Sequence, residues 1–532
     1  MRVLIFHGYL LGGTGSNVYN ARLAEALVGL GHDVHLLSQD RHPEAHGFVD
    51  AVGDWDEGTL RTAQRRGAGT ARPPVPGRGR CTVYRPDIGG LLPVYVADRY
   101  EGIEARTFAE CSDEEVARYI EANVAAVREL LALVRPQVAL ANHLVMGPVI
   151  LARALAGEVP YAVKVHGSAL EYTVKPHPER FLGLAREGIA GAGAVLVGSR
   201  HTAESLWATI GEEGLQRRTR LGPPGVDVRR FAPREPAAAA AGVRALGARL
   251  RRSEQRPRDA QEGGAFARDD LAAAAALERL EPGRDALVAF VGKLIVSKGV
   301  DLLLAAWPLV LERVPRARLV IVGFGAYRPG LERLCAALQA GDIDRAREIA
   351  LAGRALETES LAPVPLRHLL AFLDGLRGDE RERYLAAARR LDDRVVFTGR
   401  LEHEELADLL PACEALVVPS TFPEAFGMVA AEAAACGALP LSAAHSGLAE
   451  VSEALARAVP EPASAWLSFR VDDDAVGALA ERLVAWLQAD PALRSSTRTG
   501  LVSTVRERWS WDRVARGVIA AARGELDGLQ EP

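Results

Sequence analysis

Two segments of the chain begin in the same way, with a short apolar strand, a glycine-rich turn and a helix, and each continues as alternating strands and helices. The first has a strand over residues 2–6 and a helix over 18–30, and the second a strand over 287–291 and a helix over 300–313. Strands joined through helices pair in parallel, so the pattern predicts α/β, doubly wound parallel sheets. With 532 residues, too many for one ordinary core, we expect two such domains.

The composition between these series sets the expected domain limits. We expect a first domain over 1–226 and a second over 284–510. Residues 227–283 are expected to be a low-complexity linker. Within it, 235–283 is rich in Ala, Arg and Glu, is either helical or disordered, and is expected to be mobile in solution and dispensable for folding. Residues 41–90 are rich in Gly, Pro and Arg and are expected to be loop.

Residues 327–393 are longer than a connection needs and repeat apolar positions at helical spacing, so they predict a helical insertion in the second domain. Two interpretations stay open for it. The insertion is either an outgrowth packed on its own domain or a cap beside a ligand site.

Bulk properties exclude several classes of protein. The net charge of −5 gives no reason to expect nucleic acid as a partner. Five cysteines without a CxxC pair argue against a zinc site or a disulfide framework and favour the cytoplasm. No secretory signal and no run of about 18 apolar residues is visible, so we expect no membrane span. Peripheral membrane contact and the oligomeric state stay open.

The stretch from residue 415 to 436 carries the most chemical information. An apolar strand, Ala415–Val418, leads through a turn into an Ala-rich helix over 427–436. A helix N-terminus at the carboxyl end of a parallel strand binds anions, and Gly427 lets the backbone approach a ligand closely. Glu424 in the turn and Glu432 in the helix can each accept hydrogen bonds from hydroxyls. Together these groups predict a nucleotide-diphospho-sugar site, with donor contacts from Phe426, Gly427, Met428, Val429 and Glu432.

Residues 292–299, here called the phosphate loop, follow a strand and precede a helix. Lys293 and Lys298 lie at its two ends, where their ammonium groups suit a diphosphate.

The stretch with Glu424 and Glu432 resembles the E-x7-E motif of the retaining GT-B glycosyltransferases of family 4. Further segments resemble that family at Gly12-Gly13, Val165-His166-Gly167-Ser168, Pro224–Asp227, Gly447–Glu450 and Trp509-Ser510-Trp511. Lys293 stands where the family has Arg, Pro224 where it has Asn, and Ser446 where it has Gly. A fork-like Arg contact to phosphate is therefore not expected.

The resemblance implies a GT-B fold, in which two Rossmann-like domains face a central cleft and helix 511–532 returns to the first domain. It implies sugar transfer with retention, from a nucleotide-diphospho-sugar to a sugar, lipid or small-molecule acceptor. His166, Glu424 and Lys298 become the expected catalytic residues. Gly12, Gly13, Lys293 and Lys298 become expected donor contacts. His7 and His143 also end strands of the first sheet and are candidate acceptor contacts, or simple strand-end packing.

No metal or other cofactor is expected. The Asp-x-Asp matches at 54–56, 342–344 and 472–474 do not follow strands at the expected edge. Three alternatives remain open: a sugar-nucleotide epimerase, a non-catalytic protein of the same fold, and an NAD-dependent oxidoreductase. The last rests on an incomplete fingerprint, in which Gly13 and Gly15 are followed by Val18 in place of Gly, with Asp40 beyond the second strand.

Overall fold

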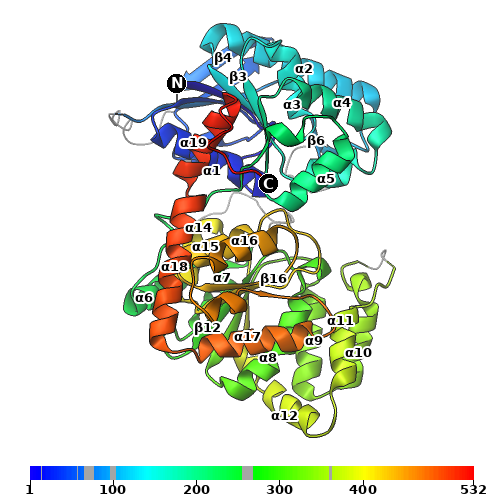
Figure 1. Cartoon of the computed structure of the whole chain (residues 1–532), viewed down its shortest axis with the longest axis vertical. Helices are drawn as coiled ribbons and strands as arrows, with labels where there is room; N and C mark the ends of the chain where they lie inside the picture. Colours follow the sequence, from blue (N-terminus) through cyan, green and yellow to red (C-terminus); the bar gives the residue numbers. More distant parts are fainter. Residues whose placement is uncertain (14, 57, 65–76, 96–103, 254–267, 359–361) are drawn as a thin grey trace. The chain divides into compact units, whose positions relative to one another are not determined.

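The computed structural model describes residues 1–13, 15–56, 58–64, 77–95, 104–253, 268–358 and 362–532. The chain forms two compact units (Figure 1). The first contains Met1–Gly225 and Trp509–Pro532, and the second contains the described residues between Val226 and Arg508. The division after Gly225 lies one residue from the expected boundary.

The described part of the first unit contains a nine-stranded sheet in the order β11-β10-β9-β8-β1-β2-β5-β3-β4. Its strands are β1 (Arg2–Phe6), β2 (Asp33–Leu37), β3 (Ala51–Asp56), β4 (Thr59–Gln64), β5 (Cys81–Arg85), β8 (Val138–Asn142), β9 (Tyr161–Lys164), β10 (Ala194–Val197) and β11 (Thr219–Leu221). The β3–β4 pair is antiparallel, and the other neighbours are parallel. β6 (Leu91–Val94) and β7 (Glu104–Thr107) pair separately.

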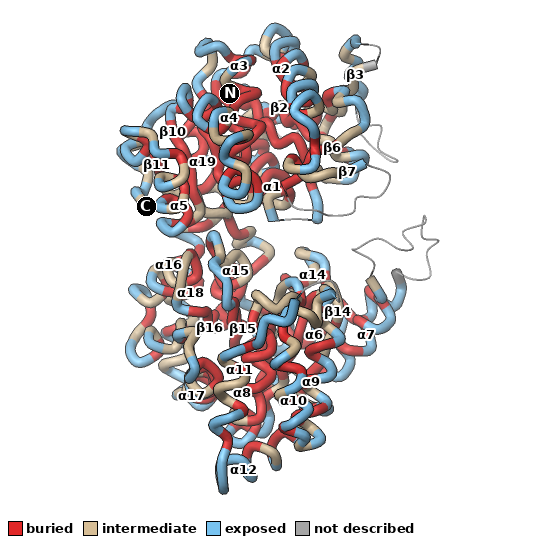
Figure 2. The backbone as a smooth tube through the Cα atoms, turned by 90° about the vertical axis from the view of Figure 1, so that its right-hand side faces the viewer, coloured by how far each residue is buried: buried red, intermediate tan, exposed pale blue. Residues whose placement is uncertain are grey.

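Helices cover both faces of this sheet, because successive strand residues point to opposite faces and the residues on both faces are apolar. In β1, Val3 and Ile5 join the core beneath α1 (Gly15–Gly29) and α19 (Trp511–Ala522), whereas Leu4 and Phe6 join the opposite core. That opposite core is covered by α2 (Asp113–Val134), α3 (Gly147–Leu155), α4 (Pro178–Ala190) and α5 (Arg200–Ile210). Figure 2 shows the buried strands inside a shell of exposed helix turns. Ser112 and Glu115 form a capping box at the start of α2.

The prediction that residues 41–90 are loop is wrong for the described residues. They form a short helix, η1 (Pro43–Ala45), and the strands β3, β4 and β5. β4 is exposed along most of its length at the sheet edge, so its sequence lacks the apolar alternation that identifies a half-buried strand. Residues 57 and 65–76 lie outside the described part.

The second unit contains, in its described residues, a six-stranded parallel sheet in the order β14-β13-β12-β15-β16-β17. Its strands are β12 (Ala286–Val291), β13 (Ala317–Val322), β14 (Val395–Gly399), β15 (Ala415–Val418), β16 (Leu439–Ala443) and β17 (Ser468–Phe469). Its helices are α6 (Pro236–Ser253), α7 (Asp270–Glu278), α8 (Val300–Arg313), α9 (Arg328–Ala340), α10 (Ile343–Ala352), α11 (Arg367–Gly375), α12 (Gly378–Ala388), α13 (Leu391–Arg394), α14 (His403–Leu409), α15 (Met428–Ala435), α16 (Ser446–Ala456), α17 (Ala475–Leu487) and α18 (Pro491–Trp509).

The described residues of 227–283 are not a linker, which corrects the sequence-based expectation. α6 and α7 pack against each other, α6 also packs on α14, and Leu246 and Leu277 are buried. Arg234 and Arg249 both pair with Asp408 of α14. The alanine runs contribute small buried residues such as Ala273, which allow close helix packing. Residues 254–267 lie outside the described part.

The described residues of the insertion 327–393 are mainly helical, as their periodicity predicts. α9 and α12 pack on α8, and α11 packs on α17. The Tyr384 hydroxyl donates to the carbonyl of Ala305 on α8 at 2.9 Å. The insertion is therefore packed on its own unit. Among the described residues, no helix has both the length and the apolar character needed to cross a membrane.

Candidate active site

The turn between β15 and α15 adopts a conformation that requires glycine at its end. Gly427 has a φ of 107°, and a Cβ there would lie 2.5 Å from a methyl group of Leu448. Gly427 precedes α15, so the amides of Met428 and Val429 belong to the first turn of the helix, where no intrahelical carbonyl can accept from them. Phe426 is buried. The expected strand and helix are thus present, and together they place a helix N-terminus at the carboxyl edge of the sheet.

Glu424 is held in this turn from three sides. Its carboxylate pairs with Lys298 of the phosphate loop and accepts a hydrogen bond from the Ser420 hydroxyl at 2.7 Å. Its amide donates to the Ser446 hydroxyl at 2.9 Å. Ser446 has a φ of 51°, a conformation that glycine adopts more readily, and the bond to Glu424 helps to hold it. The structure therefore brings the predicted residues Glu424 and Lys298 together.

The phosphate loop is joined to the same turn. Gly299, with a φ of 65°, lies so close to Pro419 that a Cβ would be 2.1 Å from the Pro419 carbonyl oxygen. The Thr421 amide donates to the Ser297 carbonyl at 2.9 Å. Lys293, at the start of the loop, is exposed and makes no hydrogen bond or ion pair with the described residues. The loop thus offers an exposed ammonium group at one end and a paired one at the other.

Glu432 is 2% exposed and has a partner that the sequence did not reveal. Nε2 of His403, the first residue of α14, lies 2.6 Å from Oε1 of Glu432. The His403 ring also packs on Phe231, with ring centroids 5.0 Å apart. The sequence feature that could have indicated His403 is its position at the start of a helix shortly after β14, at the same sheet edge as the turn.

In the first unit, the three predicted histidines form one cluster, in which His7 and His143 are buried and His166 is half-buried. His7, His143 and His166 follow the adjacent strands β1, β8 and β9. The ring centroids of His7 and His143 are 6.0 Å apart, and those of His143 and His166 are 4.9 Å apart. Burial lowers the pKa of His7 to about 4 and holds the pKa values of His143 and His166 well below their usual range. All three rings are therefore neutral near pH 7.

These rings differ in their hydrogen-bond partners. Nε2 of His7 lies 3.0 Å from Oδ1 of Asn17, and Nε2 of His166 lies 2.9 Å from Oδ1 of Asn142. Both ring nitrogens of His143 are buried without a partner among the described residues, and its φ is 67°. An unpaired imidazole in a polar cluster can bind a ligand hydroxyl.

Lys164, at the end of β9, was missed by the sequence analysis. It is 2% exposed, and its Nζ lies 5.6 Å from the centroid of the Tyr19 ring. Within the described residues no carboxylate pairs with it. Burial lowers the pKa of Lys164 to about 7. His166 packs on the same Tyr19 ring, with centroids 4.9 Å apart, so Lys164 extends the histidine cluster.

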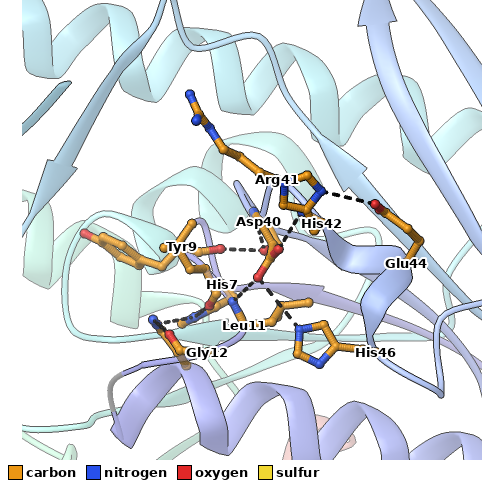
Figure 3. A network of polar contacts seen from close by, with 12 residues as sticks. His7, Tyr9, Leu11, Gly12, Asp40, Arg41, His42, Glu44 and His46 are labelled. Carbon is orange, nitrogen blue, oxygen red and sulfur yellow. Dashed lines mark hydrogen bonds and ion pairs between the residues drawn. The ribbon is translucent and has the colours of Figure 1, made fainter. Parts of the chain in front are cut away.

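The glycine turn after β1 is held by Asp40 (Figure 3). The Leu11 amide donates to Oδ2 of Asp40 at 2.8 Å, and the His42 amide donates to Oδ1 at 2.9 Å. Gly12 is exposed with nothing near the position of a Cβ, and Gly13 has a φ of 92°. Asp40 therefore holds the turn in place. Both of its carboxylate oxygens accept hydrogen bonds from backbone amides, whereas the NAD alternative needs this carboxylate to accept hydrogen bonds from a ribose.

Carboxylates of the Asp-x-Asp matches have structural partners. Asp54 pairs with Arg85, Asp342 caps α10 and Asp472 accepts from the Asp474 amide. Asp56 has no described side chain. In the part of the chain that the structure describes, no group of three or more His, Cys, Asp or Glu could hold a metal ion.

One further hollow lies outside these residues. It has a volume of about 860 Å³ and lies between Pro233 and α18.

Comparisons with known proteins agree with this arrangement. Residues 14–214 match the family model of the glycosyl transferase 4-like domain, and residues 285–364 and 369–485 match models of glycosyl transferases group 1. A D-inositol 3-phosphate glycosyltransferase of Segniliparus rotundus is 30% identical over 50% of this chain and 45% of its own length. The chain thus spans about half the length of that curated relative.

Two solved structures share the fold. Sucrose-phosphate synthase from Thermosynechococcus elongatus has a TM-score of 0.51 and 18% identity, with 99% of both chains covered. HepE from Anabaena, in complex with UDP and glucose, has a TM-score of 0.51 and 15% identity, with 98% and 99% covered. With two parallel-sheet α/β units and family models matched in both, the chain belongs to the GT-B glycosyltransferase group 1 family.

Proposed function

We propose that this protein transfers a sugar from a nucleotide-diphospho-sugar to an acceptor hydroxyl, with retention of configuration at the anomeric carbon. The observation that carries the proposal is the contact between Lys298 of the phosphate loop and Glu424 of the β15–α15 turn. It brings a cation suited to a leaving diphosphate next to a carboxylate suited to sugar hydroxyls, beside a helix N-terminus.

In this proposal the second unit binds the donor. Lys293, Lys298 and the amides at the start of α15 stabilise the charge that develops on the leaving phosphate. Glu424 accepts hydrogen bonds from the sugar, and Glu432 accepts them from the ribose. UDP is the first nucleotide to test, since the structurally similar HepE binds it.

The first unit binds the acceptor through its histidine cluster. Its rings are neutral near pH 7, so they position hydroxyl groups by hydrogen bonding and add no positive charge. His166 contacts the donor sugar, as the family resemblance implies. The acceptor hydroxyl attacks the anomeric carbon from the face that the phosphate leaves, and the leaving phosphate takes the acceptor proton. D-inositol 3-phosphate, the substrate named for a relative, is one acceptor to test.

The test combines binding with product analysis. A thermal-shift screen against UDP-, GDP- and ADP-sugars should show stabilisation by one nucleotide class, because a ligand of the native state raises apparent stability. With that donor and a panel of sugar, polyol and lipid acceptors, NMR of the product should show the anomeric configuration of the donor. An inverted product would refute retention. An epimerised nucleotide-sugar without transfer would favour the epimerase alternative.

A further inference from the structure

One side chain of the helical insertion, that of Glu357, reaches the middle of the phosphate loop. Glu357 follows the short helix η5 (Arg354–Leu356). Its Oε1 accepts a hydrogen bond from the amide of Val296 at 2.6 Å. Val296 lies between Lys293 and Lys298, and the Glu357 side chain is only 15% exposed. A residue of the insertion thus contacts the segment that carries both phosphate-binding lysines.

Other contacts of the phosphate loop come from the residues that follow β13, including Tyr327 at the start of the insertion, and from the β15–α15 turn. The Leu294 amide donates to the Phe324 carbonyl at 2.7 Å, and the Tyr327 amide donates to the Leu294 carbonyl at 3.0 Å. Near the other end, Ser297 and Lys298 are held by the β15–α15 turn. The middle of the loop is held by Glu357.

Val296 begins the helical turn η4 (Val296–Lys298), and its amide needs an acceptor from elsewhere. The residue before it, Ile295, has no polar side chain and gives no cap. A carboxylate at the start of a helical turn is a strong acceptor for such an amide. Glu357 supplies the cap that the local sequence lacks.

The backbone on both sides of Glu357 is held by hydrogen bonds and close packing. The Arg354 amide donates to the Val364 carbonyl at 3.2 Å, and the Leu366 amide donates to the Ala350 carbonyl at 2.8 Å. Gly353, with a φ of 49°, lies so close to Val364 that a Cβ would be 1.8 Å from its carbonyl oxygen. These contacts join the residues before Glu357 to those that follow it, and so fix the position from which its side chain reaches Val296.

We propose that Glu357 is a positioning residue for donor binding, through which the insertion sets the conformation of the phosphate loop. The assignment of this loop to the donor diphosphate rests on the proposed function. Glu357 acts through the Val296 amide and does not touch the ligand. Loss of its carboxylate should let residues 295–298 sample other conformations, so that Lys298 is less often in place beside Glu424.

The experiment compares Glu357→Ala and Glu357→Gln with Glu348→Ala, which removes an exposed acid of the same insertion that pairs with Arg345 on α10. In the nucleotide-free protein, hydrogen–deuterium exchange should be about tenfold faster at the Val296 amide in Glu357→Ala, because a hydrogen bond to a charged group is lost. Glu357→Gln keeps an acceptor and should stay near wild type, as should Glu348→Ala. Thermal unfolding confirms that each variant is folded.

Nucleotide binding is measured on the same proteins with UDP, GDP and ADP by calorimetry. Glu357→Ala should raise the Kd of the preferred nucleotide about tenfold, with rescue by Glu357→Gln. An unchanged exchange rate at Val296 overturns the inference, whatever the nucleotide result. Faster exchange with unchanged or tighter nucleotide binding also overturns it, since the loop would then not need Glu357 for its ligand. If wild type binds none of the three nucleotides while exchange responds as expected, the proposed function fails and only the structural contact stands.

Discussion

His403 contacts Glu432 across 29 residues of sequence, with Nε2 of the imidazole 2.6 Å from Oε1 of the carboxylate. Glu432 is almost completely buried, whereas the His403 side chain is 24% exposed. A buried carboxylate needs a hydrogen-bond partner, and His403 supplies one. In the proposed function, Glu432 accepts the ribose hydroxyls while His403 keeps its carboxylate oriented.

Glu432→Ala should weaken binding of the free nucleotide by about 1–3 kcal/mol, because buried ribose hydroxyls would lose their acceptor. Calorimetry with the preferred nucleoside diphosphate measures the change. Glu453→Ala, at an exposed position of α16, is the matched control and should bind as wild type does. Equal affinity of Glu432→Ala and wild type would refute the ribose assignment.

Lys298→Ala should lower kcat by about 10²–10³, which is typical for removal of one group that stabilises transition-state charge. Glu424→Ala should lower turnover more than nucleotide affinity, because the proposed function places Glu424 at the sugar. The two residues are paired, so a double variant should lose less than the sum of the single effects. Strictly additive losses in kcat/KM would mean that the pair does not act together.

Activity should survive treatment with EDTA. The proposed function assigns stabilisation of the leaving phosphate to Lys293, Lys298 and helix amides. In the Asp-x-Asp matches, Asp54, Asp342 and Asp472 are already engaged by structural partners. Initial rates after chelation and desalting are compared with rates in added Mg²⁺ or Mn²⁺. A loss that only a divalent cation restores would show that the donor site requires a metal.

Lys164→Met should stabilise the protein at neutral pH. Because the pKa of Lys164 falls from its ordinary value of 10.5 to about 7 on burial, the unfolded chain binds an extra proton between those values. Wild-type stability should therefore rise with pH across this window. The destabilisation caused by burying Lys164 should be fully present at and below pH 7. The variant should gain on the order of a few kcal/mol at pH 7, since one pKa unit is about 1.4 kcal/mol.

Urea unfolding at pH 7, 8 and 9 measures this gain, which should shrink as the pH rises. Lys175→Met is the control, because Lys175 is partly exposed and pairs with Glu171. A difference between Lys164→Met and wild type that does not change with pH would mean that Lys164 is charged in the folded protein.

Leu246→Ala in α6 should reduce the free energy of unfolding by about 2–5 kcal/mol, as expected for a fully buried leucine. Leu271→Ala in the neighbouring helix α7 makes the same change at a residue that is 46% exposed, so its effect should be small. Denaturant unfolding compares the two. Equal stabilities would restore the interpretation of this segment as a dispensable linker.

Local sequence was sufficient to predict features that a single continuous segment of the chain forms. The strand at 415–418 and the helix after Gly427 were predicted from a short stretch, and the structure has them within one residue. Their roles stay predictions until ligand binding is measured. The helical character of 327–393 was likewise visible from its spacing.

Contacts between distant segments could not be predicted. His403 meets Glu432, Glu357 meets Val296 and Lys164 meets Tyr19 only because the sheets bring their elements together. The alanine runs near 240 and 273 indicated a mobile linker because their residues are small, but small residues also let α6 and α7 approach closely. The exposed edge strand β4 was missed because it buries little apolar surface.

The return of α19 to the first unit has a consequence for synthesis. Trp511 packs on Tyr19, with ring centroids 5.4 Å apart, and Gly225 lies against the same indole. A ribosome makes residues 1–225 first, yet the part of one sheet face beside α1 stays uncovered until residues 511–522 have emerged. The second unit can fold in the interval. The unit that is started first is therefore completed last, and during translation its exposed apolar face is a natural target for chaperones.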